Sequence, residues 1–197
     1  KGKMMDTIKV AIIDYEMGNL FSVERACEFV GLRPIITKSK SEILNSDAVI
    51  LPGVGAFGEA MDNINRLDLA GCIKDFIETK KPFMGICLGL QLLFTESEEF
   101  GNNKGLNIIE GKVLKFPKQN KNGDNLKIPQ VGWNRIYYNS LKMKTNWESS
   151  PLLGIKEDEY MYFVHSYYTK PNNDSVILSL TDYESIEYCS LILKKCF

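Results

Sequence analysis

The chain lacks any long uninterrupted run of apolar residues. No stretch approaches the roughly 18–20 apolar residues that a membrane-spanning helix needs, and the first residues do not have the pattern of a secretory signal peptide. Residues 1–5 are expected to be a remnant that precedes or overlaps the native start, so the fold is argued from residue 6 onward. These absences predict no membrane association and a cytoplasmic location.

An excess of charge of either sign is also missing. The 197 residues include 24 Lys and Arg against 25 Asp and Glu, for a formal net charge of −1. With no basic stripe along the chain, nucleic acid is not an expected partner. Hydrophobic residues make up 44% and charged residues 25%, which is ordinary for a soluble enzyme, and the length predicts one compact domain over 6–197.

The sequence has no closely spaced pair of cysteines and only a single histidine, His165. An odd number of scattered cysteines without a CxxC pair predicts neither a disulfide framework nor a zinc site. We therefore expect no metal, no cofactor and a reducing compartment. The five cysteines are Cys27, Cys72, Cys87, Cys189 and Cys196.

Short buried-strand patterns alternate with helical patterns in the first half. This alternation predicts parallel βαβ units, whose ligands bind at the carboxyl ends of the strands. Asn19 is a candidate N-cap for the first helix, and Gly71 marks a break in the long one. Strands are predicted over 8–13, 34–37, 48–51 and 82–86, and helices over 19–30, 59–80 and 88–95.

The second half has short β-type runs with little helix between them. These runs predict antiparallel strands added to a mainly parallel central sheet, or a mixed sheet, in an α/β fold. A polar segment, 117–127, is expected to be a surface loop. The predicted strands are 111–116, 136–138, 160–164, 176–180 and 188–193.

The segment 81–94, KPFMGICLGLQLLF, has the pattern of a nucleophile elbow. Cys87 falls between a predicted strand and a predicted helix, with Gly85 two residues before it and Gly89 two residues after. Glycines at these positions avoid side-chain clashes in a sharp turn. The helix that follows directs N–H groups at the sulfur, which favours the thiolate. Cys87 is therefore the predicted nucleophile.

A cysteine that attacks an amide carbonyl also needs an oxyanion hole. The PGVG segment, 52–55, can direct backbone N–H groups inward, and the Leu88 N–H offers another donor. Gln91, one turn after Cys87, is polar within an apolar run and suits either a polar substrate or solvent. His165 is either a base for Cys87 or a hydrogen-bonded residue at a strand end, and the sequence alone leaves both readings open.

At this point the chain resembles the class I (triad) glutamine amidotransferases, and within them the glutaminase subunit of imidazole glycerol phosphate synthase. The matching segments occur in the family's order and span nearly the whole chain. PGVGAFG and VGWN are the most specific of them. The segments are IIDYEMGNL (12–20), LPGVGAFGEAM (51–61), GICLGLQLLF (85–94), GLNIIEGKV (105–113), IPQVGWN (128–134) and YFVHSYY (162–168).

The resemblance implies a three-layer α/β fold of the class I glutamine amidotransferase type. It implies that Cys87 attacks the side-chain amide of glutamine and releases ammonia. The ammonia would pass to a (βα)₈-barrel cyclase/synthase subunit, and the heterodimer would make imidazole glycerol phosphate for histidine biosynthesis. Glutaminase activity would depend on that partner. The implied roles are oxyanion binding by Gly53, Val54 and Leu88, glutamine binding by Gly55, Gln91, Ser166 and Tyr167, and partner contact by Asn19, Gln130, Trp133 and Asn134.

The chain departs from the family pattern at two places. The resemblance implies a catalytic histidine and glutamate in an H-P-E motif that would lie beyond Phe197, so the sequence is expected to lack the C-terminal strand and helix. His165 matches the substrate-side FVHSY motif instead and does not replace that histidine. The second departure is Gln130, where the family commonly has histidine.

Three other functions fit parts of this pattern. A paralogous glutaminase could supply ammonia for a surface amino or amidino sugar. A non-catalytic scaffold could keep the fold without turning over glutamine. Another α/β hydrolase with a cysteine elbow, such as a thiol protease-like enzyme, would need His165 beside Cys87 and has no use for VGWN.

Overall fold

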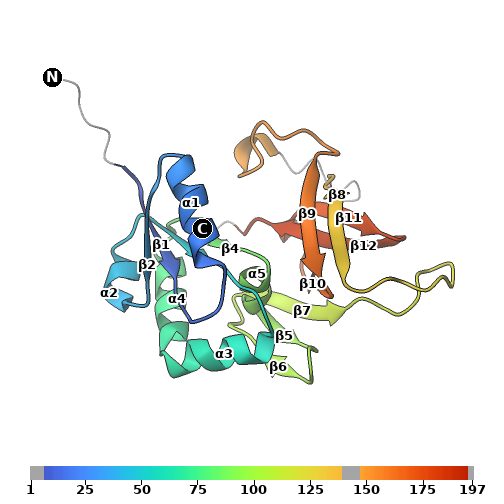
Figure 1. The fold of residues 1–197 in the computed structure, drawn as a ribbon, viewed down its shortest axis with the longest axis horizontal. Helices are drawn as coiled ribbons and strands as arrows, with labels where there is room; N and C mark the ends of the chain where they lie inside the picture. The colour runs from blue at the N-terminus through green and yellow to red at the C-terminus, as the bar shows by residue number, and fades with distance from the viewer. Residues whose placement is uncertain (1–6, 139–146, 195–197) are drawn as a thin grey trace. The chain divides into compact units, whose positions relative to one another are not determined.

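The computed structural model describes residues 7–138 and 147–194. They form two compact units (Figure 1). Unit 1 comprises 7–93 with 104–108, and unit 2 comprises 94–103 with 109–194. The predicted remnant at 1–5 and Cys196 lie outside the described residues. The single domain expected over 6–197 stays a prediction, and each unit is described by itself.

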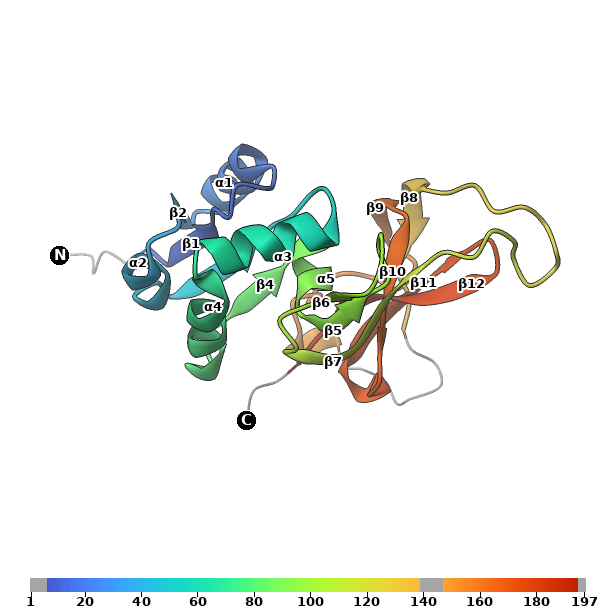
Figure 2. The same cartoon turned by 90° about the horizontal axis from the view of Figure 1, so that it is seen from below.

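Unit 1 is built on a four-stranded parallel sheet in the order β2-β1-β3-β4. The central β1 is apolar throughout its buried part, as a parallel strand covered on both faces should be. Helix α1 lies on one side of this sheet and α4 on the other (Figure 2). The strands are β1 Lys9–Ile13, β2 Arg33–Thr37, β3 Ala48–Leu51 and β4 Phe83–Gly85; the helices are α1 Leu20–Phe29, α2 Lys40–Leu44, α3 Phe57–Arg66, α4 Leu69–Glu78 and α5 Leu88–Leu92.

The first helix begins where the sequence predicts. The Asn19 side chain accepts a hydrogen bond from the Ser22 backbone N–H, which is the expected N-cap. The apolar stripe of α1 is less buried than a core-facing helix requires: Cys27 is buried, but Val30 is 66% exposed.

Of two predicted helix boundaries, one is approximately right and one is wrong. The long helix is interrupted near Gly71, as predicted, but the break is at Asp68, whose φ of 54° separates α3 from α4, and Gly71 itself lies inside α4. The helix after Cys87 ends at Leu92 rather than Thr95, because β5 begins at Phe94. Strand pairing with β7, in which Phe94 lies opposite Ile109, overrides the helical character of the segment.

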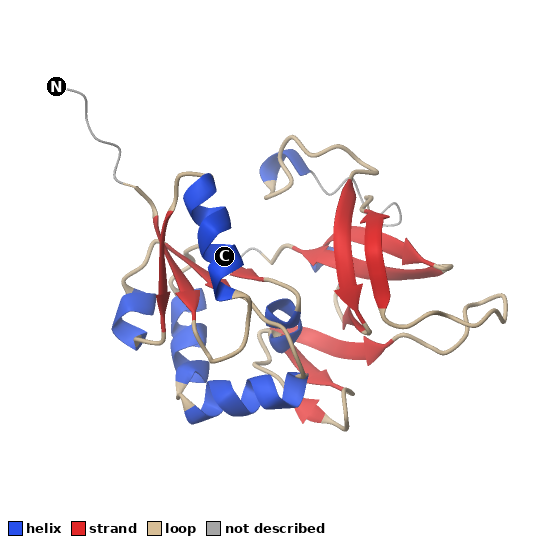
Figure 3. Cartoon of the chain, in the orientation of Figure 1, coloured by secondary structure: helices blue, strands red, loops and turns tan. Residues whose placement is uncertain are grey.

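Unit 2 is mostly β-structure (Figure 3). A mixed six-stranded sheet has the order β11-β12-β10-β7-β5-β6, and β8 and β9 form a separate antiparallel pair. The strand expected over 136–138 is instead an isolated bridge between Tyr137 and Leu180, and β10 was not predicted. The strands are β5 Phe94–Ser97, β6 Asn103–Lys104, β7 Ile109–Lys115, β8 Gln130–Arg135, β9 Tyr160–His165, β10 Tyr167–Pro171, β11 Ile177–Tyr183 and β12 Ile186–Ile192.

The core of unit 2 is divided into separate clusters. Phe116 packs with Ile186 and Tyr188 in one of them. Trp147 anchors another and donates its indole N–H to the Leu178 carbonyl at 3.0 Å. The polar segment 117–127 is largely exposed, as expected of a surface loop. In the described part of the chain, no helix has the length and apolarity needed to cross a membrane.

The beginning of α5 lies against the end of β3 with no space between them. A Cβ at Gly89 would stand 1.8 Å from the Leu51 carbonyl oxygen, and one at Gly85 would stand 2.8 Å from the Gly89 carbonyl oxygen. Backbone atoms meet both positions, so a side chain there can fit only if a strand or helix moves.

Gly89→Ala should therefore destabilise the protein. We expect overpacking against the backbone to lower the free energy of unfolding by about 2 kcal/mol or more. Urea unfolding followed by circular dichroism measures the change.

Gly71→Ala is the matched control, since it makes the same change within a helix. A Cβ at Gly71 meets nothing within 4 Å. We expect this variant to be stabilised by roughly 0.5–1 kcal/mol, as alanine is favoured over glycine in a helix interior. Equal unfolding midpoints for the two variants would contradict the packing argument.

Candidate functional site

Three loops of unit 1 follow the carboxyl ends of parallel strands. They are 14–19 after β1, 52–56 after β3 and the turn at Ile86 and Cys87 after β4. Because these strands are parallel neighbours, the loops share one edge of the sheet. The DYEMGN, PGVGAFG and GICLG segments therefore meet at the edge where ligands of parallel βαβ units were expected to bind.

Cys87 occupies a strained turn between β4 and α5. Its backbone has φ 54° and ψ −115°, a combination that residues other than glycine rarely adopt. Hydrogen bonds hold the turn from both sides: the Ile86 N–H donates to the Leu51 carbonyl at 3.0 Å, and the Gly89 N–H donates to the Ile86 carbonyl at 2.9 Å. Cys87 itself is exposed. This strand-to-helix turn, with an exposed cysteine at its apex, is the geometry of a nucleophile elbow.

The segment 52–55 lies against the start of α5. A Cβ at Gly53 would stand 2.8 Å from the Gly89 nitrogen and 2.8 Å from the Leu88 Cβ, so only glycine allows this approach. Gly55 has a φ of +98°, and Val54 is 54% exposed. The backbones of the predicted oxyanion residues Gly53 and Leu88 are therefore neighbours.

Tyr15 holds this segment in place, and the sequence analysis did not single it out. Its hydroxyl donates to the Pro52 carbonyl at 2.8 Å, and both residues are buried. Burial and the nearby Cys87 raise the pKa of the Tyr15 phenol, so it stays protonated as a donor. The sequence signal for Tyr15 was its place two residues after the buried strand β1, at the edge of the sheet where the loops meet.

The electrostatics at Cys87 differ from the prediction. Burial among protein atoms raises the pKa of the Cys87 thiol above its ordinary value, and a hydrogen bond from the Leu88 backbone opposes this only in part. Helix α5 is five residues long, and its start does not offset the desolvation. The expectation that the helix start favours the thiolate is corrected, because burial outweighs the Leu88 backbone hydrogen bond and raises the pKa of the thiol.

The other predicted substrate residues belong to both units. Gln91 is half-buried in α5, where its backbone N–H donates to the Cys87 carbonyl at 3.2 Å. Ser166 and Tyr167 lie in unit 2, between β9 and β10 and at the start of β10. Glu99 and Glu98 contribute, after burial, to raising the pKa of the Tyr167 phenol, which places two carboxylates near it. The SEE run at 97–99 was the sequence signal for them.

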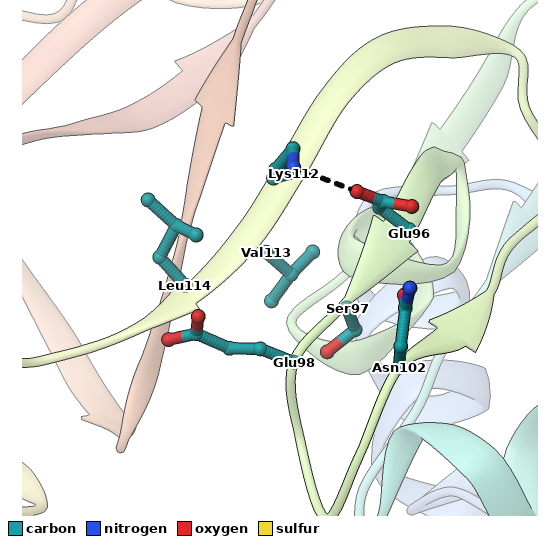
Figure 4. A pocket seen from close by; sticks show the side chains of 7 residues that line it. All are labelled: Glu96, Ser97, Glu98, Asn102, Lys112, Val113 and Leu114. Atoms are coloured by element: carbon teal, nitrogen blue, oxygen red, sulfur yellow. Dashed lines mark ion pairs between the residues drawn. The ribbon is translucent and has the colours of Figure 1, made fainter.

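A polar pocket of about 190 Å³ lies in unit 2, beside β5 and β7. Lys112 and Glu96 point toward each other there and form an ion pair at 2.8 Å (Figure 4). The pocket is smaller than a typical ligand site, and Cys87 is not among its lining residues. Among the residues that the structure describes, no three His, Cys, Asp or Glu side chains gather as metal ligands do.

Both ring nitrogens of His165 are occupied within unit 2. Nδ1 lies 2.8 Å from the Tyr167 carbonyl oxygen, and Nε2 lies 3.2 Å from the Tyr188 hydroxyl. Burial lowers the pKa of the His165 imidazole, so the ring is neutral near pH 7. This is the hydrogen-bonded strand-end residue that the sequence left as one of two readings.

The four predicted partner residues differ in their surroundings. Trp133 is 69% exposed, and the exposed Asn19 uses its side chain as the α1 cap. Asn134 is half-buried and donates to the Asp182 carbonyl at 2.7 Å. Gln130 is only 2% exposed, so its side chain does not contribute to the outer face of β8.

Comparisons with known proteins give the family. The sequence profile of glutamine amidotransferase class-I matches residues 11–196. Imidazole glycerol phosphate synthase subunit HisH of Geobacillus kaustophilus (strain HTA426) is 43% identical over 175 residues, covering 89% of this chain and 79% of the relative. The subunit of the same name from Aquifex aeolicus (strain VF5) is 44% identical over 177 residues, with the same coverage.

Two solved structures have a similar fold. A glutamine amidotransferase crystal structure aligns with a TM-score of 0.62 at 14% identity, covering 90% of this chain and 86% of the other. PurLQS from Thermotoga maritima gives a TM-score of 0.61 at 18% identity, with 91% and 77% covered. The predicted α/β fold of the class I glutamine amidotransferases is confirmed, but the antiparallel strands of the second half lie in a separate mixed sheet and in the β8–β9 pair, not in the parallel sheet. The chain belongs to the class I glutamine amidotransferase family.

Proposed function

We propose that this chain is the glutaminase subunit of an imidazole glycerol phosphate synthase, which hydrolyses glutamine and supplies ammonia for histidine biosynthesis. The observation that carries the proposal is Cys87, an exposed cysteine held at φ 54° in the elbow of a class I glutamine amidotransferase. The relatives that bear this subunit's name, at 43% and 44% identity, support the pathway.

The reaction proceeds by covalent catalysis at the Cys87 sulfur. The thiolate attacks the side-chain carbonyl carbon of glutamine, and a carbon–sulfur bond forms as the carbonyl becomes an oxyanion. The oxyanion collapses, the carbon–nitrogen bond breaks, and the nitrogen leaves as ammonia after it takes up a proton. Water then attacks the glutamyl thioester, releasing glutamate and restoring the thiol.

The backbone around the elbow is suited to the oxyanion. The Leu88 backbone is already directed at the sulfur, and the Gly53–Val54 segment is held against the same turn. N–H groups from these two places stabilise developing negative charge at little reorganisation cost. On the resemblance, Gly55 and Gln91 of unit 1 and Ser166 and Tyr167 of unit 2 are assigned to glutamine binding.

A general base is required, because the Cys87 thiol is protonated at rest. His165 has both ring nitrogens engaged within unit 2, so it is not assigned this role. The resemblance assigns this role to the histidine of an H-P-E motif, which a glutamate orients.

The outer face of the β8–β9 pair is the proposed docking surface for the cyclase subunit, a (βα)₈ barrel. Alternate residues of the two strands lie opposite one another on this face, which we call the ribbon face. Trp133 and Tyr162 contact edge to face with centroids 5.5 Å apart, and the Arg135 guanidinium lies 5.2 Å from the centre of the Tyr160 ring. The ribbon face consists of Val131, Trp133, Arg135, Tyr160, Tyr162 and Val164.

Exposed tryptophan, tyrosine and arginine side chains are those most often found at the centre of protein interfaces. Trp133 is 69% and Tyr162 57% exposed in this chain. A face so apolar on an enzyme subunit supports a stable protein partner. Asn19 and Asn134 are assigned to the same partner contact on the resemblance alone.

Cys87→Ala should abolish glutamate release by the full-length protein assembled with its cyclase subunit. The variant removes the nucleophile at an exposed position, so folding should be unchanged. A coupled glutamate dehydrogenase assay measures turnover. Cys27→Ala, which removes a buried thiol in α1, should retain it. Wild-type turnover by the Cys87 variant would contradict the mechanism.

The reactivity of Cys87 should rise with pH beyond the range of an ordinary thiol. Because its pKa is raised above 9.0 in this chain, the thiolate fraction is small at pH 7 and is still increasing at pH 9. Alkylation of the isolated chain by iodoacetamide, located by peptide mass spectrometry, gives the rate at Cys87 alone. A rate that levels off below pH 8 would contradict the raised pKa.

Trp133→Ala should weaken cyclase binding by roughly 10- to 100-fold, the loss expected of an interface tryptophan. Isothermal titration calorimetry with the purified cyclase subunit measures the affinity. Phe29→Ala is the control, since Phe29 is 91% exposed on α1 and lies outside the ribbon face. Equal affinities for the two variants would exclude the ribbon face as the docking surface.

A further inference from the structure

A chain of hydrogen bonds crosses the interior of unit 2. The Tyr188 hydroxyl lies 2.9 Å from Gln130 Oε1 and 3.2 Å from His165 Nε2, and His165 Nδ1 lies 2.8 Å from the Tyr167 carbonyl oxygen. Gln130 is 2% exposed and Tyr188 4%. We call Gln130, Tyr188, His165 and the Tyr167 carbonyl the buried relay. Its members come from four different strands, β8, β12, β9 and β10.

The two ends of the buried relay adjoin different functional regions. Gln130 and His165 are opposite one another in the β8–β9 pair, with Val131 and Val164 next to them on the ribbon face. At the other end, Tyr167 follows Ser166, and both are proposed to hold glutamine. The relay therefore runs from behind the docking surface to the substrate-side backbone.

Aromatic rings fix the orientation of the groups in the middle. The Phe116 ring lies 5.2 Å from the His165 ring and 5.4 Å from the Tyr188 ring, the latter edge to face at 85°. Phe163 packs against Tyr188 at 6.1 Å and 88°. With rings on several sides, neither the imidazole nor the phenol can turn away from its partners without opening this cluster.

The number of protons makes the members of the relay interdependent. His165 must donate from Nδ1 to the Tyr167 carbonyl, so its neutral ring leaves Nε2 as an acceptor. The Tyr188 hydroxyl has one proton but faces two acceptors, Nε2 and Gln130 Oε1. If the proton turns to Nε2, Gln130 must present its amide N–H to the phenol oxygen. The position of the Gln130 amide thus sets which bond His165 can make.

A further donor stands beside the phenol. Among the described residues the buried Thr181 hydroxyl has no hydrogen-bond partner. Burial raises the pKa of the Tyr188 phenol, and the nearby Gln130 and Thr181 side chains oppose this in part. The Thr181 hydroxyl can donate to the phenol oxygen when the phenol proton turns toward His165. Both arrangements of the relay are therefore accessible without leaving the phenol oxygen unsatisfied.

We propose that Tyr188 is a positioning residue that couples strand β8 to the Ser166–Tyr167 segment, so that docking of the cyclase subunit on the ribbon face changes how glutamine is bound and turned over. This inference rests on the proposed function, which supplies the partner and the substrate. A shift of β8 moves the Gln130 amide, the phenol proton follows, and the His165 bond to the Tyr167 carbonyl changes in strength.

The test measures partner stimulation in the full-length heterodimer. Glutaminase kcat and KM are determined with and without the cyclase subunit for wild type, Tyr188→Phe, Gln130→Leu and the double variant. Stimulation is the ratio of the two kcat/KM values. Tyr137→Phe is the matched control, because its hydroxyl donates at 2.9 Å to Glu187, outside the relay. Unfolding midpoints and cyclase affinity are measured for every variant.

We expect Tyr188→Phe and Gln130→Leu each to lower stimulation about tenfold, within the usual range of coupling between two sites. Cyclase affinity should stay within about twofold of wild type in these variants, because the ribbon face is untouched. The double variant should lose no more than either single one, since both interrupt the same relay. Tyr137→Phe should be stimulated like wild type.

Stimulation within twofold of wild type in both single variants would overturn the proposal, as would losses that add in the double variant. If Tyr188→Phe fails to fold, Gln130→Leu still interrupts the relay with the phenol in place, and its stimulation decides. If the wild-type protein binds the cyclase subunit but its glutaminase kcat/KM does not rise, the proposed partner-dependent function is wrong. The role proposed for the buried relay is then wrong as well.

Discussion

The contact between the start of α5 and the end of β3 is the constraint on which the site depends. Gly89 has no side chain, and a Cβ there would stand 1.8 Å from the Leu51 carbonyl. This approach holds Cys87 in its left-handed turn and brings the backbone of Leu88 beside Gly53. The strained cysteine is tolerated because the surrounding backbone bonds fix the turn from both sides. The proposed nucleophile and the proposed oxyanion donors are thus positioned by backbone packing.

Features specified by short-range sequence were predictable. The Asn19 cap, the continuous apolar strands and the glycines around Cys87 each depend on residues within a few positions of one another. The errors are at places where distant strands decide. The segment from Phe94 continues a helical pattern, yet it becomes β5 because β7 pairs with it. The helix break at Asp68 is a backbone conformation that no residue type there required.

The surroundings of the proposed substrate and partner residues depend on the register in which the strands pair, and a single sequence does not give that register. In QVGWNR, the apolar Val131 and Trp133 would ordinarily face inward, and Gln130 would face solvent. The structure has the reverse, with Gln130 buried on Tyr188 and Trp133 exposed. A shift of one residue exchanges the two faces of a strand. Tyr15 stands near the end of a buried strand, which is visible in the sequence, but its hydrogen-bond partner Pro52 lies 37 positions away and is not.

The outward-facing apolar side chains of β8 and the protonated Cys87 thiol both suit a subunit that is active only with its partner. A subunit that makes ammonia for another enzyme wastes glutamine whenever it acts alone, so low reactivity at rest is an advantage. Burial provides it by raising the pKa of Cys87. Trp133 and Tyr162 of the ribbon face are exposed, and the proposed docking of the cyclase subunit would remove this apolar surface from water. With a buried polar chain directly behind that face, covering it can alter the substrate side without any residue of the partner reaching the sulfur.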